Sequence, residues 1–102
     1  MEAITKSFAT KNGPVEGVQV KWPGFSILLV SGSKAALFCG VFDLDAFDKF
    51  GYPAALVEST PDNPIGTLER FPNRKIRKSN LKAQSLGIEA GMDVLEAFEL
   101  IA

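Results

Sequence analysis

The sequence contains no histidine and a single cysteine, and both shortages restrict the chemistry open to one chain. Zinc sites of the Cys/His type need about four such ligands, so one chain cannot build one. Nucleophile pairs of the Ser-His or Cys-His kind are excluded because the base is missing. Walker-type and dinucleotide-binding glycine patterns are absent as well. The sequence therefore predicts no metal and no cofactor, and leaves acid–base work to carboxylates, lysines or Tyr52.

Long apolar runs are also missing. The longest, such as Ile27–Val30, fall far short of the roughly 20 residues that a membrane helix needs. The first residues, Met1–Lys6, lack the basic start and apolar stretch of a signal peptide. One cysteine cannot form an intrachain disulfide, so nothing indicates secretion. We therefore expect a cytoplasmic protein without a membrane partner.

What is present fits a single globular domain over residues 1–102. Hydrophobic residues make up 46% of the chain and the net charge is −1, which disfavours disorder. The balanced charge also argues against a surface devoted to nucleic acid.

Residues 1–42 have the pattern of a strand meander. Val18, Val20 and Trp22 alternate with polar residues at the period of a strand. The segment Phe25–Val30 is almost wholly apolar, which is typical of a strand covered on both faces or lying at a subunit interface. A further strand is predicted over 35–41. The turns fall at Asn12-Gly13, Pro23-Gly24 and Ser31-Gly32-Ser33.

Residues 43–102 read as a mixed α and β region. Asp43 is a plausible N-cap for a helix over 44–50 that ends at Gly51. A strand over 53–57, a proline-stiffened connection over 58–74 and a short helix over 81–86 follow, the helix capped by Ser79 or Asn80. In the last helix, Asp93 and Glu96 have capping-box spacing. Its apolar stripe comprises Val94, Leu95, Phe98 and Ile101.

This order predicts an α+β fold. We expect a two-layer α-β sandwich: a mainly antiparallel meander of about four to five strands, followed by short helices on one face. The few short helices leave apolar strand surface uncovered, so we expect residues 1–42 to be the oligomerisation region.

Cys39 is the candidate nucleophile, at the end of the fourth strand. A reactive thiol needs a nearby cation or helix N-terminus that stabilises the thiolate, and Asp43 would oppose it. The alternative is a buried cysteine that packs as a small apolar residue, with Gly40 allowing close backbone approach. We favour the buried cysteine.

Six basic residues lie between positions 70 and 82 with no acid among them. Three of them, Arg70, Arg74 and Arg77, are candidates for binding an anionic ligand. A solvated segment paired with acidic faces is the favoured alternative, and the scarcity of aromatic residues disfavours nucleic acid. Thr60 lies in a turn-rich loop and is a further candidate, although a plain surface turn is favoured there. The basic residues are Arg70, Arg74, Lys75, Arg77, Lys78 and Lys82.

Asp43, Asp45 and Asp48 form an acidic cluster that could offer oxygen ligands to a hard cation. They lack the glycine and distal glutamate of an EF-hand loop. Negative charge at the start of a helix explains them equally simply, and we favour that interpretation.

Several segments together resemble the YunC-like family, a small bacterial and archaeal domain of unknown function. The most specific are the Cys39-Gly40 pair and the run Leu86–Met92, supported by Ser31–Lys34, Phe42-Asp43 and Glu96-Ala97. The resemblance covers nearly the whole chain. It implies a two-layer α-β domain whose N-terminal β region mediates tetramerisation, and it implies no activity. Thr60 and Leu68 fall where the family has a Val-x-Thr and a Leu-Leu pattern, but Glu69 departs from it, so no site is transferred.

Two functions are favoured over a third option, nucleic-acid binding by the basic segment. The first is an oligomeric small-molecule-binding or structural module of unknown ligand, with Gly40, Thr60, Arg70, Arg74 and Arg77 as binding residues. The second is a small thiol-dependent enzyme that uses Cys39 on an anionic substrate. The expected partners are other copies of the chain, in a tetramer, and an unidentified small ligand.

Overall fold

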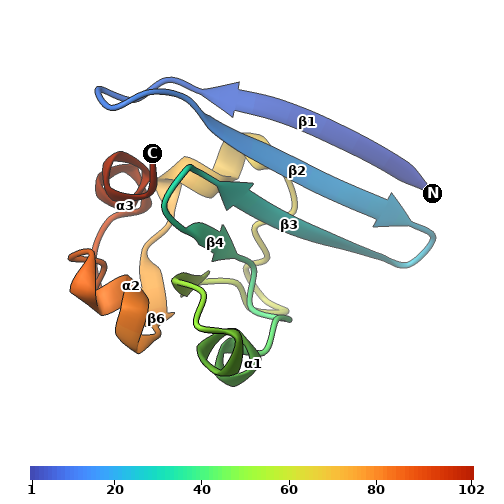
Figure 1. Ribbon diagram of the computed structural model, residues 1–102. Coiled ribbons are helices and arrows are strands. Elements are labelled where there is room, and N and C mark those ends of the chain that lie inside the picture. Colours follow the sequence, from blue (N-terminus) through green and yellow to red (C-terminus); the bar gives the residue numbers. More distant parts are fainter.

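The computed structural model describes residues 1–102 as one six-stranded sheet flanked by short helices (Figure 1). The strands are β1 (Glu2–Phe8), β2 (Val15–Trp22), β3 (Phe25–Ser31), β4 (Ala36–Phe38), β5 (Ala54–Val57) and β6 (Ile76–Ser79). The helices are α1 (Leu44–Phe50), the 3₁₀ helix η1 (Leu68–Asn73), α2 (Leu81–Ser85) and α3 (Val94–Ile101). None of these helices has the length and apolar character needed to cross a lipid bilayer.

The strands lie in chain order, β1-β2-β3-β4-β5-β6, and all neighbours are antiparallel except β4 and β5. The predicted α+β fold is therefore confirmed. The strand count of four to five was low because β6 lies inside the basic segment, where no alternating pattern marks it. A bulge opposite Leu56 and Val57 breaks the alternation of β6: its ends, Ile76 and Ser79, are buried and both residues between them are exposed.

Pro23-Gly24 forms the predicted two-residue turn between β2 and β3. The tight turn predicted at Asn12-Gly13 is wrong: residues 9–14 join β1 to β2, and the Gly13 N–H donates to the Thr10 carbonyl within this longer loop. Gly13 and Gly24 have φ values of 119° and 91°, which residues other than glycine rarely adopt. The result is a long three-stranded arm, blue to teal in Figure 1, that extends beyond the rest of the sheet.

The parallel pair is joined through α1, which follows the predicted limits. The Asp43 side chain accepts a hydrogen bond from the Asp45 backbone, and Gly51 ends the helix in the left-handed conformation. β4 is shorter than the predicted 35–41, because the chain turns at Cys39: its carbonyl accepts from the Phe42 N–H.

Helices cover both faces of the sheet, not one face as predicted. The larger core contains Leu37 and Val57 and packs against η1, α2 and α3. Ala36 and Leu56, on the other face of the same strands, pack with Leu44 of α1 in a smaller cluster. The difference arises from the β4–α1–β5 crossover, which carries the chain over the opposite face between two parallel strands.

In β2 a small residue and a polar residue, Gly17 and Gln19, follow Val15 on the face toward the larger core. Gly17 is buried, and a Cβ at this position would lie only 3.0 Å from the Leu68 side chain. Gln19 is 5% exposed, and its amide donates to the Gly66 carbonyl at 2.7 Å. The close approach of η1 and of the loop before it thus selects a small residue and a hydrogen-bonding residue at these two positions.

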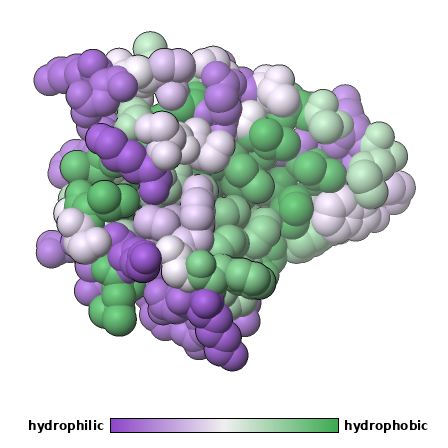
Figure 2. Space-filling model, viewed as in Figure 1, coloured by the Kyte–Doolittle hydropathy of each residue, from purple (hydrophilic) through white to green (hydrophobic).

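The opposite face of the arm has no helix over it, and we call it the open face. Pairing along β2 and β3 aligns Val18 with Leu29 and Val20 with Ile27. All four are half-buried, and Trp22 on the same face is 37% exposed. Figure 2 shows hydrophobic surface gathered over the middle of β2 and β3 in this view. The open face comprises Val18, Val20, Trp22, Ile27 and Leu29.

The C-terminal helices differ from the prediction in one cap. Asn80, one of the two predicted caps of α2, accepts from the Ala83 N–H at 2.9 Å. The capping box of α3 is wrong: the Asp93 side chain makes no capping hydrogen bond and instead lies 3.7 Å from the Lys75 ammonium. Leu95, placed in the apolar stripe, is 58% exposed.

Candidate functional site

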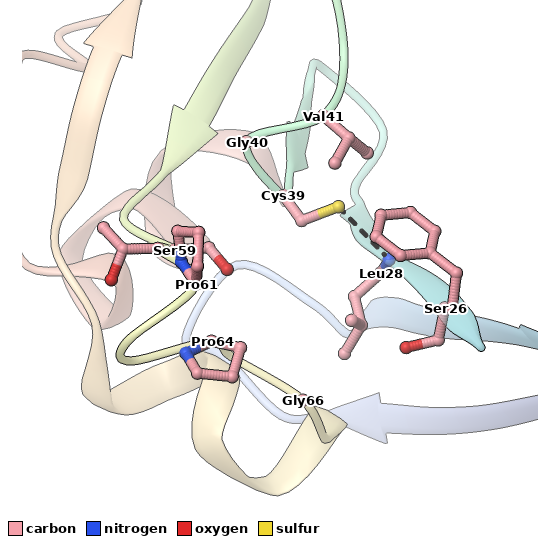
Figure 3. Close-up of a pocket in the computed structure, with 11 residues that line it drawn as sticks. Ser26, Leu28, Cys39, Gly40, Val41, Ser59, Pro61, Pro64 and Gly66 are labelled. Atoms are coloured by element: carbon pink, nitrogen blue, oxygen red, sulfur yellow. Dashed lines mark hydrogen bonds between the residues drawn. The ribbon is translucent and has the colours of Figure 1, made fainter.

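A pocket of about 500 Å³ opens where the parallel strands β4 and β5 end (Figure 3). Crevices at the carboxyl ends of parallel strands are frequent ligand sites in α/β sheets. Here the flanking strand β3 starts at the same edge and supplies one wall. Because the pocket lies between the arm and the rest of the sheet, we call it the seam pocket. Its lining comprises Phe25, Ser26, Leu28, Cys39, Gly40, Val41, Ser59, Thr60, Pro61, Pro64 and Gly66.

Cys39 contributes to the seam pocket although only 5% of it is exposed. Its sulfur points toward Leu28, whose backbone N–H donates to it at 3.5 Å (Figure 3). The Cys39 carbonyl makes no hydrogen bond to that N–H and accepts from the Phe42 N–H in the turn. The sulfur therefore replaces the ladder hydrogen bond that β4 would otherwise supply to β3.

A second hollow, of about 400 Å³, adjoins the first and contains two of the candidate arginines. We call it the arginine pocket. It shares Ser59 and Thr60 with the seam pocket, so one loop forms a wall of both. Its lining comprises Glu58, Ser59, Thr60, Asn63, Asn73, Arg74 and Arg77.

Arg74 holds this shared loop in place. Its guanidinium donates to the Asn63 carbonyl at 2.7 Å, the Asn63 side-chain oxygen at 3.1 Å and the Pro64 carbonyl at 2.8 Å. A longer contact of 3.5 Å reaches the Glu58 carbonyl. These four contacts use the terminal N–H groups of Arg74, so the residue positions the loop rather than presenting free donors.

Arg77 differs from Arg74 because it makes no hydrogen bond or salt bridge. It is the extra residue of the β6 bulge, since Ile76 and Lys78 pair with consecutive residues of β5. Bulges often redirect a side chain at a functional edge. One of its guanidinium nitrogens lies 4.0 Å from the point that a Cβ on Gly40 would occupy. Arg77 is thus an exposed cation at the boundary between the two pockets.

The shared loop is built from hydroxyl and proline residues. Thr60 Oγ1 accepts from the Asn63 N–H at 3.0 Å, closing the turn. Ser59 Oγ accepts from the Ile65 N–H at 3.2 Å. Both hydroxyls act as acceptors here, which leaves each O–H free to donate.

The structure brings the candidate residues of the sequence into one region. Cys39, Gly40 and Thr60 line the seam pocket, and Arg74 and Arg77 line the arginine pocket. Arg70 lines neither, but its guanidinium lies 3.3 Å from the Cβ position of Gly66. Sequence reasoning did not identify three lining residues that β3 contributes, because antiparallel pairing brings that strand to the site without any local signal. They are Phe25, Ser26 and Leu28.

The acidic residues of α1 do not form a cation site. No group of three or more His, Cys, Asp and Glu residues has the geometry to hold a metal. Asp43 instead serves as the helix cap.

Comparison with known proteins places this region inside a family of unknown function. The family model described as "Domain of unknown function (DUF1805)" matches residues 38–101, which contain all six candidate residues. No curated protein matches the sequence at a significant level. The structure is similar to the crystal structure of a protein of unknown function from Thermoplasma acidophilum, with a TM-score of 0.85 and 19% identity. The match covers 99% of this chain and 94% of that one, and at this identity it shows the fold alone.

Proposed function

The chain belongs to the DUF1805 family of domains of unknown function, and from its own geometry we propose that it binds a small molecule in the seam pocket. The observation that carries the proposal is a concave, mainly apolar site at the ends of two parallel strands. Its volume of about 500 Å³ lies in the usual range for small-ligand pockets. A few polar groups, among them Ser26, Ser59 and Thr60, would orient the ligand.

The pocket is held open by contacts that do not involve a ligand. Arg74 fixes one side of the loop, and the buried Gln19 fixes the other through the Gly66 carbonyl. A preformed site loses less conformational entropy on binding than one that must be ordered. These two contacts therefore favour binding, because the pocket is already formed without a ligand.

The test is a fragment screen by protein NMR with uncharged and anionic fragments. We expect some fragments to bind, with shift changes concentrated at the amides of Gly40, Thr60 and Gly66. Fragments of this size bind with dissociation constants on the order of 1 mM. Shift changes confined to other parts of the chain, or none at all, would overturn the proposal.

A thiol-dependent enzyme is the second candidate, because Cys39 lines the same pocket. In that role the sulfur would bond to a carbonyl carbon of a bound anionic substrate, with the C=O π bond opening and the thiol proton passing to the carbonyl oxygen. The chain then has to expose the sulfur more than the present 5%. Alkylation by iodoacetamide decides the matter: an enzyme requires labelling in the native state at least as fast as a free thiol, whereas labelling only after unfolding rules it out.

We also propose that copies of the chain associate through the open face, in the tetramer that a YunC-like protein would form. Exposed apolar patches on globular proteins commonly mark such interfaces. The open face continues into the cluster under α1 through Leu29, which packs against Phe38 and its neighbours. A cytoplasmic location is part of the same proposal.

A further inference from the structure

We infer that the ligand of the seam pocket is an apolar molecule with a terminal phosphate or carboxylate, and that Arg77 binds this acidic group. The inference rests on the proposed function and specifies the class of ligand. Its apolar body lies in the seam pocket, and its acidic group reaches into the arginine pocket.

The two pockets are close enough for one molecule to occupy both. Ser59 and Thr60 line both of them. At the boundary, a Cβ on Gly40 would lie 3.5 Å from the Ser59 carbonyl and 4.0 Å from the Arg77 guanidinium. A side chain at position 40 would therefore fill the space between the apolar wall and the cation. Glycine leaves that space free.

Charge is distributed unevenly between the two pockets. No charged residue lines the seam pocket, whereas the arginine pocket contains Arg74, Arg77 and the exposed Glu58. The terminal donors of Arg74 are already bound to backbone and amide oxygens. Arg77 alone therefore has a complete set of free donors, arranged in the planar fork that matches a carboxylate or a phosphate.

The shared loop supplies neutral donors beside this cation. The oxygens of Ser59 and Thr60 accept backbone N–H groups, which leaves their hydroxyl protons free for an anion. Glu58 is the one acid in the arginine pocket and disfavours an anion there. Arg77 offsets the charge of Glu58, and the two hydroxyls add neutral donors along the same loop.

The test compares hexyl phosphate with 1-hexanol, two probes with the same chain and different charge. Binding is followed by the amide shifts of Gly40, Ser59 and Thr60. We expect hexyl phosphate to bind roughly tenfold more tightly than 1-hexanol, as one charge-assisted contact at an exposed site allows. Hexanoate, the carboxylate analogue, should show the same preference over 1-hexanol.

The variant Arg77→Gln removes the charge but retains a donor. We expect it to reduce the preference for hexyl phosphate to within about twofold, while 1-hexanol binds as before. Lys78→Gln is the matched control, since it removes the same charge from the next residue of β6, which lines neither the seam pocket nor the arginine pocket. It should leave the preference intact.

The outcomes separate this inference from the proposed function. If 1-hexanol and hexyl phosphate both bind in the seam pocket equally well, the proposed function stands and the anionic ligand is wrong. The same conclusion follows if Arg77→Gln and Lys78→Gln weaken the binding of hexyl phosphate equally, because the effect then comes from the net charge of the protein. If neither these probes nor any screened fragment binds in the seam pocket, both fail.

Discussion

The centre of the sheet and its N-terminal edge lie in opposite environments. Every residue of β4 and β5 is buried, because helices cover both faces of these strands. In β1 every residue except Phe8 is exposed, and the open face beside it has no cover. The apolar residues of the open face differ from those of β4 and β5 in having no helix over them. The connections between strands decide which faces are covered, and the seam pocket lies where the two regions meet.

The largest expected effect is on the free energy of unfolding, when the same Phe→Ala substitution is made in each of the two regions. Phe71→Ala, at a side chain with no exposed surface in the larger core, should lower the free energy of unfolding by about 3–5 kcal/mol. Phe25→Ala, at a side chain 51% exposed on the arm, should cost less than about 1 kcal/mol. Denaturant unfolding measures both losses, at protein concentrations over which the denaturation midpoint does not change. Equal losses would show that the arm is as tightly packed as the centre.

A smaller effect is expected where β3 meets β4. Cys39→Ala removes the sulfur that accepts the Leu28 N–H, so we expect a loss of about 1–2 kcal/mol. The substitution should increase the rate of amide hydrogen exchange more at Leu28 than at Val30, which lies in the paired part of β3. Unchanged exchange at Leu28 would mean that the sulfur contact has no structural role.

The two arginines of the arginine pocket should differ in their contribution to stability. Arg74→Gln breaks the contacts that hold the Asn63–Pro64 turn and should cost about 1 kcal/mol. Arg77→Gln breaks none and should change stability by no more than about 0.5 kcal/mol. Thermal unfolding of the two variants is a direct comparison. If Arg77→Gln proves as destabilising as Arg74→Gln, Arg77 is not a free cation.

The smallest effect on the chain's own stability is expected at the open face. Val20→Lys places a charge on a half-exposed position and should change the monomer's stability by about 0.5 kcal/mol or less. Its effect on assembly should be large, because an unpaired charge in an apolar interface is costly. Sedimentation should show a tetramer for the natural chain and a monomer for Val20→Lys. Ser7→Lys, beside Glu16 on the same sheet face, is the control and should remain a tetramer.

A natural chain that is strictly monomeric at micromolar concentration would contradict the proposed association. A Val20→Lys variant that stays tetrameric would mean that the chain associates through a surface other than the open face.

Features that depend on neighbouring residues were predictable from the sequence. The limits of α1 follow from Asp43 and Gly51, and Asn80 was among the predicted caps of α2. The capping box at Asp93 was wrong because a distant lysine, Lys75, is available to the carboxylate. Local spacing cannot reveal such a competing partner.

The candidate site was predictable in its residues but not in their roles. Cys39 and Gly40 stood out as neighbours in the sequence, and the arginines stood out by charge. That Arg74 is bound and Arg77 is free could not be predicted, because the partners of Arg74 are chiefly backbone carbonyls. Backbone groups are present at every position and leave no mark in the sequence. The bulge that frees Arg77 depends on pairing with β5, a contact between distant segments.

The central claim is that one ligand occupies both the seam pocket and the arginine pocket. A crystal structure of the protein soaked with hexyl phosphate tests it most directly. The account predicts the hexyl chain between Phe25, Cys39 and Pro64, with a phosphate oxygen within hydrogen-bonding distance of the Arg77 guanidinium. A hexyl phosphate bound elsewhere on the chain, or one whose phosphate points away from Arg77 into solvent, would contradict it.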